Sequence, residues 1–307
     1  MAGIVIVDPP DGVHPTSSEC GRDSHGGRAL DAPGRGTHMT RYGLGLPCRD
    51  GAPEIQIMIR PRTTTLVACL VLAACSDAGA TGTIEVLERL AHDAGAYTQG
   101  LELHDGVLYE STGKYGESDV RTVDPSTGEV LSRWELGPDH FGEGLTRVGE
   151  RMLQLTWRER IVLSYPMALA APDTLDFPSD GWGACFDGST LWTTSGGSLV
   201  TGRDPQSLET TRQFQVMRGG SVVREVNELE CVGDHIYANV YLTNDLLKID
   251  KETGEALVTW DLTSLVPPEF LGAAEEVPNG IAYDAATDSF YITGKWWPVM
   301  YRVRLVE

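Results

Sequence analysis

The sequence predicts an all-β protein and, within that class, a five-bladed β-propeller closed by an N-terminal strand. From about residue 84 onward, short alternating or apolar runs are separated by Gly, Asp and Asn turns, and no long helical period is present. The pattern also repeats: five units of roughly 40 to 50 residues each hold three or four short strands, which is typical of a propeller. An open β-sandwich is the alternative.

The repeat is defined by its first strand, which follows a similar loop in every unit. The five first strands are expected at 100–103, 144–147, 183–186, 228–232 and 280–283. In the last unit a third strand at 300–305 is the final one. We therefore expect residues 83–88 to supply its outer strand, because pairing the two ends closes the ring and removes an exposed sheet edge.

The composition fits a globular protein with an acidic surface. Hydrophobic residues make up 41% of the 307 residues, and 24 Lys and Arg stand against 44 Asp and Glu, a formal net charge of -20. A surface of this charge disfavours nucleic acid and anionic lipid as binding partners.

The first 57 residues lack the features of a folded domain. They are crowded with Gly, Pro, Asp, Arg and Ser, they show no sustained period, and their His and Cys residues have no metal-site spacing. We interpret residues 1–57 as a disordered or spurious extension ahead of a true translation start at Met58.

Residues 58–75 have the layout of an export signal. Arg60 and Arg62 precede an apolar run at 66–74, which is too short to span a bilayer, since that needs about 20 residues. The last four residues, LAAC, resemble the bacterial lipobox, in which the cysteine is lipidated. We therefore expect an exported protein that is anchored in the periplasm or cell envelope through Cys75, with a linker at 76–83 before a β-propeller domain at 84–307. A plain secretory signal and a buried apolar strand are the alternatives.

Two cysteines remain in the exported domain. Cys185 and Cys231 fall at matching places in neighbouring repeats and could face each other in an oxidising compartment. Two small buried thiols are the favoured interpretation. No spacing in this part of the sequence resembles a zinc site, and we expect no metal.

Glu143 is the first candidate for a general acid and base. It lies between Gly142 and Gly144 and behind the aromatic ring of Phe141. The glycines allow backbone and substrate to approach closely, and the ring can keep water away and raise the pKa of the carboxyl group. Taken alone, the motif is also compatible with a Gly-rich turn and a solvated glutamate.

Loops from different repeats are expected to meet on one face of the propeller. In each blade, the loop that enters the first strand and the loop that leaves the second strand lie on the same side. The residues that these loops contribute are Tyr97, Gln99, Phe141, Glu143, Trp157, Trp182, Asn227, Tyr241, Asn279 and Lys295. A carboxylate, a lysine, amides and aromatic rings together form the profile of a small-ligand pocket.

Each of these residues also has a purely structural interpretation. Trp157 and Trp182 could pack between blades, Lys295 could be a solvated charge, and Asn279 could form a turn. The neighbouring residues Glu228 and Glu230 are predicted to be structural or solvated, and His92 and His235 to lie on the surface.

The ordered set of loops resembles the plant and bacterial glutaminyl cyclases. The motifs that carry the resemblance are YTQGL at 97–101, YESTG at 109–113, FGEG at 141–144, GWG at 181–183, NELE at 227–230, NGIA at 279–282 and TGK at 293–295 with WP at 297–298. The resemblance runs from about residue 84 to the C-terminus. It implies a five-bladed propeller that is unrelated to the zinc-dependent animal enzymes and needs no cofactor.

The resemblance also implies an activity and a set of site residues. The family are glutaminyl-peptide cyclotransferases, which convert an N-terminal glutaminyl residue into 5-oxoproline and release ammonia. Glu143 matches the catalytic glutamate, and the positions that match substrate-contacting residues are Gln99, Trp157, Trp182, Asn227 and Lys295. Phe141 is expected to wall the same site. Tyr97 stands where phenylalanine is frequent, and Tyr241 stands where the plant enzymes carry tryptophan.

Two other function classes remain open at this point. A calcium-dependent lactonase propeller could use Glu143, Asn227 and Asn279 as ligands. A site for a hard metal ion, however, has no role for a lysine such as Lys295. A non-catalytic propeller could use the same pocket to bind an amine. For the cyclase we expect N-terminal glutaminyl peptides or proteins as partners, membrane contact only through the Cys75 lipid, and a monomer.

Overall fold

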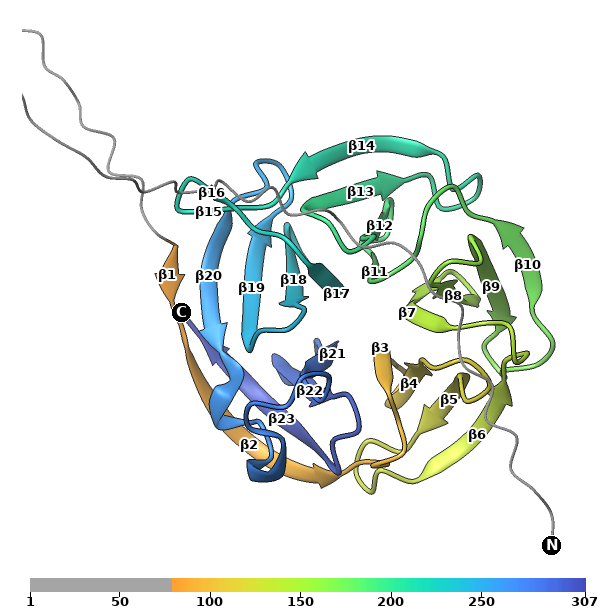
Figure 1. Ribbon diagram of the computed structural model, residues 1–307, viewed down its shortest axis with the longest axis horizontal. Coiled ribbons are helices and arrows are strands. Elements are labelled where there is room, and N and C mark those ends of the chain that lie inside the picture. The colour runs from red at the N-terminus through yellow and green to blue at the C-terminus, as the bar shows by residue number, and fades with distance from the viewer. Residues whose placement is uncertain (1–78) are drawn as a thin grey trace, which may run out of the picture. The chain divides into compact units, whose positions relative to one another are not determined.

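The computed structural model describes residues 79–307, which form a ring of five antiparallel sheets around a central axis (Figure 1). This arrangement confirms the five-bladed propeller predicted from the repeats. The interpretations of residues 1–57 and 58–75, including lipidation of Cys75, lie outside the described residues. Among residues 79–307, no helix is both long and apolar enough for a membrane crossing.

Blades 1 to 4 are each built on a meander of four strands that follow one another outward from the axis. Blade 1 consists of β3 (Thr98–His104), β4 (Val107–Thr112), β5 (Asp119–Val123) and β6 (Val130–Glu135). Blade 2 consists of β7 (Gly142–Val148), β8 (Arg151–Thr156), β9 (Ile161–Pro166) and β10 (Asp173–Asp176). Blade 3 consists of β11 (Ala184–Phe186), β12 (Leu191–Thr193), β13 (Leu199–Arg203) and β14 (Thr210–Gln215). Blade 4 consists of β17 (Val226–Val232), β18 (His235–Val240), β19 (Asp245–Asp250) and β20 (Ala256–Asp261).

Blade 5 joins the two ends of the ring. It consists of β21 (Pro278–Asp284), β22 (Ser289–Gly294), β23 (Val299–Val306) and, outermost, β2 (Thr83–Ala91). The register runs from Thr83 opposite Val306 to Ala91 opposite Val299, which confirms the closing strand predicted from the sequence. The short strand β1 (Ala80–Thr81), within the segment 76–83 for which the sequence predicts a linker, pairs in parallel with β20.

Smaller elements lie in the connections between blades. A hairpin of β15 (Met217–Arg218) and β16 (Ser221–Val222) follows blade 3, and two 3-10 turns, η1 (Leu262–Ser264) and η2 (Pro268–Phe270), follow blade 4. The long connection from η2 to β21 reaches the rim of the site described below.

The apolar core is divided into five layers, one between each pair of neighbouring blades. Each blade is covered on both faces, so successive side chains of its inner strands are buried on opposite sides. In β8, for example, Met152 packs toward blade 1 and Leu153 toward blade 3. This explains why several strands read as continuous apolar runs instead of alternating ones.

Glycines allow the first strands of neighbouring blades to approach closely around the axis. A Cβ atom on Gly183 would lie 1.9 Å from the backbone oxygen of Asn227, and one on Gly144 would lie 2.5 Å from that of Trp182. No side chain fits at either position without moving a backbone. In blade 4, Glu228 stands at the matching place.

Two acidic residues of β17 lie buried beside the axis. Glu228 accepts a hydrogen bond from the backbone N–H of Leu101 in blade 1 at 3.5 Å, and Glu230 accepts one from Tyr283 in blade 5 at 3.2 Å. Burial raises the pKa of both carboxyl groups well above the ordinary value. The structural interpretation of these residues is therefore correct, and the solvated one is wrong.

A disulfide bond links the first strands of blades 3 and 4. Cys185 in β11 and Cys231 in β17 are joined, with their Cα atoms 5.4 Å apart. The favoured prediction of two free thiols is therefore wrong. The physical reason is the alternation of side chains along a strand: Cys185 lies two residues after Gly183 and Cys231 three residues after the matching Glu228, so the two side chains point to opposite faces of their blades and meet in the layer between blades 3 and 4.

Candidate active site

A pocket with a volume of about 190 Å³ brings the predicted residues together. It is lined by Tyr97, Gln99, Lys114, Phe141, Glu143, Trp157, Trp182, Asn227, Tyr241, Glu275 and Lys295. Of the loop residues that the sequence analysis expects on this face, all except Asn279 are in this set. They come from all five blades, as the convergence of the loops requires.

Local distortions of the first strands turn several of these side chains into the pocket. The strand register shifts between Thr98 and Gly100, between Gly142 and Leu145, between Val226 and Leu229, and between Pro278 and Ile281. The residues within these irregular stretches include Gln99, Glu143, Asn227 and Asn279. A β-bulge bends a strand and redirects a side chain, so the repeat places one redirected polar residue in each of these four blades.

The two glycines that flank Glu143 are required by their surroundings. A Cβ atom on Gly142 would lie 2.5 Å from the backbone oxygen of Thr112, and one on Gly144 would meet blade 3 as described above. The backbone oxygen of Glu143 accepts a hydrogen bond of 2.5 Å from the hydroxyl of Ser111. The backbone that carries the carboxyl group is therefore held on both sides.

The carboxyl group of Glu143 is buried but faces the pocket. Only 4% of the residue is exposed, and within residues 79–307 no group hydrogen-bonds its carboxylate oxygens. Burial raises the pKa of Glu143 well above its ordinary value, the charge of Lys295 partly opposes this, and Glu159 adds to it. A carboxyl group with a raised pKa is a stronger base than a solvated one and can accept a proton and pass it on.

Lys295 lies on the loop between β22 and β23 and is 2% exposed. Its Nζ donates a hydrogen bond to Oε1 of Gln99 and lies 4.3 Å from the centre of the Tyr97 ring. Burial lowers the pKa of Lys295 to about 8, although the charge of Glu143 acts in the opposite direction. The ammonium group is therefore held in place with further N–H groups left for a ligand.

A chain of side-chain amides runs beside Lys295. The Nδ2 of Asn279 donates to Oε1 of Gln99 at 3.2 Å, and the Nδ2 of Asn227 donates to Oδ1 of Asn279 at 2.9 Å. The Oδ1 of Asn227 is buried and has no hydrogen-bond partner among the described residues. Because an unpaired buried acceptor is unfavourable, this oxygen is a candidate to accept an N–H group of a ligand.

Aromatic rings form the walls. Phe141 packs against Trp157 with ring centres 5.4 Å apart and lies 6.2 Å from Tyr97. On the other side, Trp182 meets Tyr241 edge to face at 5.5 Å. These rings surround the polar groups with apolar surface, which strengthens the electrostatic interactions inside the pocket.

Two residues at the mouth were not predicted. Nζ of Lys114 lies 2.9 Å from Oε2 of Glu275 and 4.1 Å from the centre of the Tyr97 ring. Lys114 follows the second strand of blade 1, so the loop rule that selected Trp157 could have found it. Glu275 lies in the irregular connection before β21, for which the repeat gives no signal.

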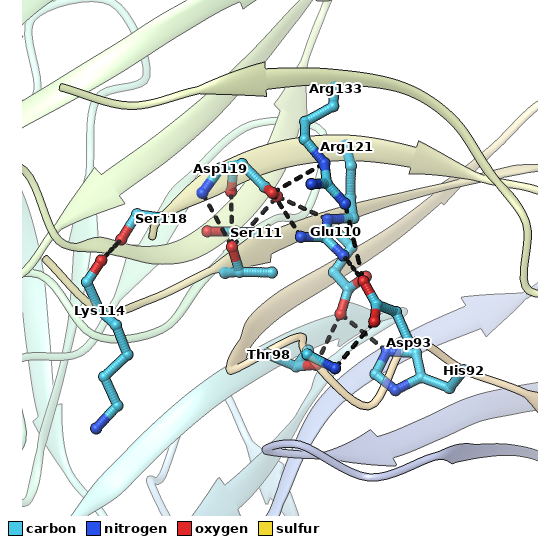
Figure 2. Close-up of polar contacts among 12 residues, drawn as sticks. His92, Asp93, Thr98, Glu110, Ser111, Lys114, Ser118, Asp119, Arg121 and Arg133 are labelled. Atoms are coloured by element: carbon cyan, nitrogen blue, oxygen red, sulfur yellow. Dashed lines mark hydrogen bonds and ion pairs between the residues drawn. The ribbon is translucent and has the colours of Figure 1, made fainter. Parts of the chain in front are cut away.

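His92 is buried, so the prediction that it lies on the surface is wrong. It is 8% exposed, and its Nε2 lies 2.9 Å from Oε1 of Glu110 in a polar network that extends through blade 1 (Figure 2). His92 belongs to the crossing from the outer strand β2 to the inner strand β3, where blades 5 and 1 cover it. His235 is partly exposed.

Comparisons with known proteins agree with this site. A family model described as glutamine cyclotransferase matches residues 62–305. A curated glutaminyl-peptide cyclotransferase of Arabidopsis thaliana is 36% identical over 231 residues, which cover 73% of this chain and 72% of that protein. The crystal structure of Myxococcus xanthus glutaminyl cyclase matches with a TM-score of 0.69 and 31% identity, over 74% of this chain and 98% of that one. The chain therefore belongs to the glutamine cyclotransferase family.

Proposed function

We propose that this protein cyclises N-terminal glutaminyl residues of peptides or proteins to 5-oxoproline and releases ammonia. The observation that carries the proposal is the pocket itself, in which a buried carboxyl group, a buried lysine and a buried asparagine line the same small space. Family membership and the name of the curated relative support the same activity.

The reaction is intramolecular and needs no nucleophile from the protein. The α-amine nitrogen attacks the side-chain amide carbon, the carbonyl oxygen becomes negatively charged, and the bond to the amide nitrogen then breaks. One proton leaves the attacking nitrogen and one is added to the leaving nitrogen. The protein must therefore fold the substrate, move a proton and stabilise an oxyanion.

Glu143 is proposed as the proton shuttle. Its carboxyl group lies in the pocket, no protein group among the described residues occupies its oxygens, and burial raises its pKa toward the range useful for proton transfer. A single carboxyl group can accept the proton of the attacking amine and give it to the departing amide nitrogen.

Lys295 is proposed to stabilise the oxyanion. Gln99 occupies one of its N–H groups and fixes its direction, and the others remain for the substrate oxygen. Gln99 matches a substrate-contacting position of the family, but its Oε1 already accepts hydrogen bonds from Lys295 and Asn279. We therefore assign Gln99 to orienting Lys295, and we assign the unpaired Oδ1 of Asn227 to a substrate N–H group.

The aromatic walls are proposed to hold the substrate side chain in a ring-ready shape. A volume of about 190 Å³ corresponds to roughly six water molecules at ~30 Å³ each, which suits one amino-acid side chain. Phe141, Trp157 and Trp182 would exclude water from this space and so protect the reaction from hydrolysis.

The arrangement favours cyclisation over calcium-dependent lactone hydrolysis. The Oδ1 of Asn279, which a lactonase would need as a metal ligand, already accepts a hydrogen bond from Asn227, and the Lys295 ammonium lies in the same pocket as Asn227. A hard cation binds best among several converging oxygen ligands and away from a positive charge.

We further propose that the protein is exported and held in the cell envelope by a lipid on Cys75. The signal-like pattern at 58–75 supports this, and so does the disulfide between Cys185 and Cys231, since disulfides persist in oxidising compartments. Intact-mass measurement of protein extracted from native membranes tests it. An N-terminus upstream of Cys75, or a mass without lipid, would contradict the proposal.

The activity is tested by incubating the purified protein with a short peptide that begins with Gln, in the presence of a chelator. Release of ammonia and formation of the 5-oxoproline peptide are expected. The same peptide with an acetylated α-amine is the matched control, because it cannot attack. Unchanged peptide in both samples would contradict the cyclase and favour a binding propeller.

A further inference from the structure

His92 holds the loop that carries Lys295. Its backbone N–H donates to the carbonyl oxygen of Pro298 at 3.2 Å, and its Nδ1 lies 2.6 Å from the carbonyl oxygen of Trp297. The hydroxyl of Thr293, at the end of β22 just before this loop, lies 3.3 Å from Nδ1. A single buried residue therefore contacts both ends of the turn that presents Lys295 to the pocket.

The other side of His92 reaches the strand that carries Gln99. Its Nε2 contacts Oε1 of Glu110 at 2.9 Å, and the hydroxyl of Thr98 donates to the same oxygen at 2.7 Å (Figure 2). Thr98 immediately precedes Gln99. The His92 and Glu110 side chains are each 1% exposed, so these contacts are shielded from water.

These contacts form a continuous ring of interactions that begins and ends at Lys295. Lys295 binds Gln99, whose neighbour Thr98 binds Glu110, and Glu110 binds His92, which binds the Lys295 loop. We infer that His92 and Glu110 are positioning residues for the cyclisation: the buried pair fixes the ammonium group of Lys295 relative to Gln99 and the substrate oxygen.

The protonation of the pair follows from its partners. Nδ1 faces a carbonyl oxygen and Nε2 faces a carboxylate oxygen that already accepts a hydroxyl hydrogen, so both ring nitrogens donate and the imidazole is charged. Burial alone lowers the pKa of His92, but the charge and hydrogen bond of Glu110, with help from Asp93, leave this pKa above its ordinary value. Burial alone raises the pKa of Glu110, but His92 and Arg121 leave it below its ordinary value.

The charges of Asp93 and Arg121 also act on the pair. Arg121 contacts both Asp93 and Asp119, and Arg133 contacts Asp119, so the charges next to the pair are themselves paired (Figure 2). Oε2 of Glu110 is buried without a partner among residues 79–307. Removing His92 would leave the buried carboxylate of Glu110 without its partner charge. The resulting movement of Glu110 would disturb Thr98 and with it strand β3, which carries Gln99.

The test measures kcat, KM and the pH profile of His92→Ala and Glu110→Ala. Because displacement of a catalytic group by about 1 Å lowers rates by up to about a hundredfold, kcat is expected to fall between about tenfold and a hundredfold while KM changes less. The ammonium group of Lys295 should also become more hydrated, and its pKa should therefore rise. The alkaline limb of kcat/KM should then move from about pH 8 toward 10.5. A variant that only contains less folded protein would show a lower rate with the alkaline limb at its original pH.

Conservative variants separate positioning from folding. Glu110→Gln keeps an oxygen for Thr98 and an N–H group for a neutral His92, so it should restore most of kcat and return the alkaline limb to its original position. If His92→Ala or Glu110→Ala does not fold, Glu110→Gln and His92→Asn are compared instead. The alkaline limb of kcat/KM should then move further in His92→Asn than in Glu110→Gln. If the limb moves in neither variant, the inference is overturned.

Lys251→Ala is the matched control. Lys251 forms a largely buried ion pair with Asp187 at 3.0 Å in blades 3 and 4 and does not line the pocket, so its loss should lower stability without changing kcat or the limb. The inference rests on the proposed role of Lys295, and the two fail separately. Full activity in Lys295→Met would remove that role, whereas an inactive Lys295→Met beside unaffected His92 and Glu110 variants would overturn the positioning inference alone.

Discussion

Glu143 and Lys295 face the same buried pocket without forming an ion pair with each other, although they come from blades 2 and 5. Each still acts on the other: the charge of Lys295 opposes the rise in the pKa of Glu143, and Glu143 opposes the fall in the pKa of Lys295. The space between them is thus suited to a substrate that takes a proton from one and a hydrogen bond from the other.

The first prediction concerns the proton shuttle. Glu143→Gln should keep the fold and lose most of the rate, by about two orders of magnitude or more, because the amide has nearly the same shape but cannot carry a proton between the two nitrogens. Ammonia release measures the rate, and circular dichroism checks the fold. Glu150→Gln, in an exposed turn, is the matched control and should be unaffected. Near-normal turnover of Glu143→Gln would remove Glu143 from the mechanism.

The second prediction concerns pH. Lys295 is charged below about pH 8 and loses its proton above it, so kcat/KM should fall as the pH rises through this value. An acid limb should come from the substrate, whose α-amine has a pKa of about 7.7–8.0 and must be neutral to attack. The alkaline limb should be absent from Lys295→Met when its residual rate is measured. The same limb in both proteins would assign it to another group.

The third prediction concerns the glycine behind Glu143. A Cβ on Gly144 would lie 2.5 Å from the backbone oxygen of Trp182, so Gly144→Ala must push blades 2 and 3 apart. We expect the free energy of unfolding to fall by about 1–3 kcal/mol, together with a loss of kcat, because the strand of Glu143 moves. Urea unfolding and ammonia release measure the two effects. Gly197→Ala, where a Cβ meets nothing within 4 Å, should leave both unchanged.

The fourth prediction concerns the disulfide. Replacing Cys185 and Cys231 by Ser should lower the free energy of unfolding by about 2–4 kcal/mol, because the unfolded chain is no longer restrained across 46 residues. Activity should stay near that of the parent, since neither sulfur lines the pocket. Urea unfolding with and without reductant is the measurement. Reductant should destabilise the parent and have no effect on the double variant; equal stability of the reduced and oxidised parent would refute the prediction.

The sequence predicts the ring and the site residues because both depend on a repeated local pattern. Turn glycines, such as Gly106 and Gly188, mark the hairpins, and the redirected residues Gln99, Glu143 and Asn227 recur at one place in the repeat. Once the ring closes, these positions must meet near its axis.

The features that the sequence did not predict depend on contacts between distant segments. His92 is buried because its ring binds Trp297, 205 residues away, and nothing near His92 in the sequence indicates this. Glu275 reaches the mouth from an irregular connection that has no counterpart in the other repeats. The pairing of Cys185 with Cys231 depends on the face of its blade to which each side chain points, and the similar places of the two residues in the repeat do not indicate this.

The last prediction concerns the mouth of the pocket. The ion pair between Lys114 and Glu275 is partly exposed and should contribute little to stability. Both residues line the pocket and are partly exposed to solvent, so we expect the residue that follows the N-terminal Gln to lie beside them. Glu275→Gln leaves Lys114 without its partner charge, and KM should therefore fall a few-fold for peptides with an acidic second residue and rise for those with a basic one, while kcat stays nearly constant. Steady-state kinetics with Gln-Glu, Gln-Ala and Gln-Lys peptides measure this. Equal changes in KM for all three peptides would show that the pair does not contact the second residue.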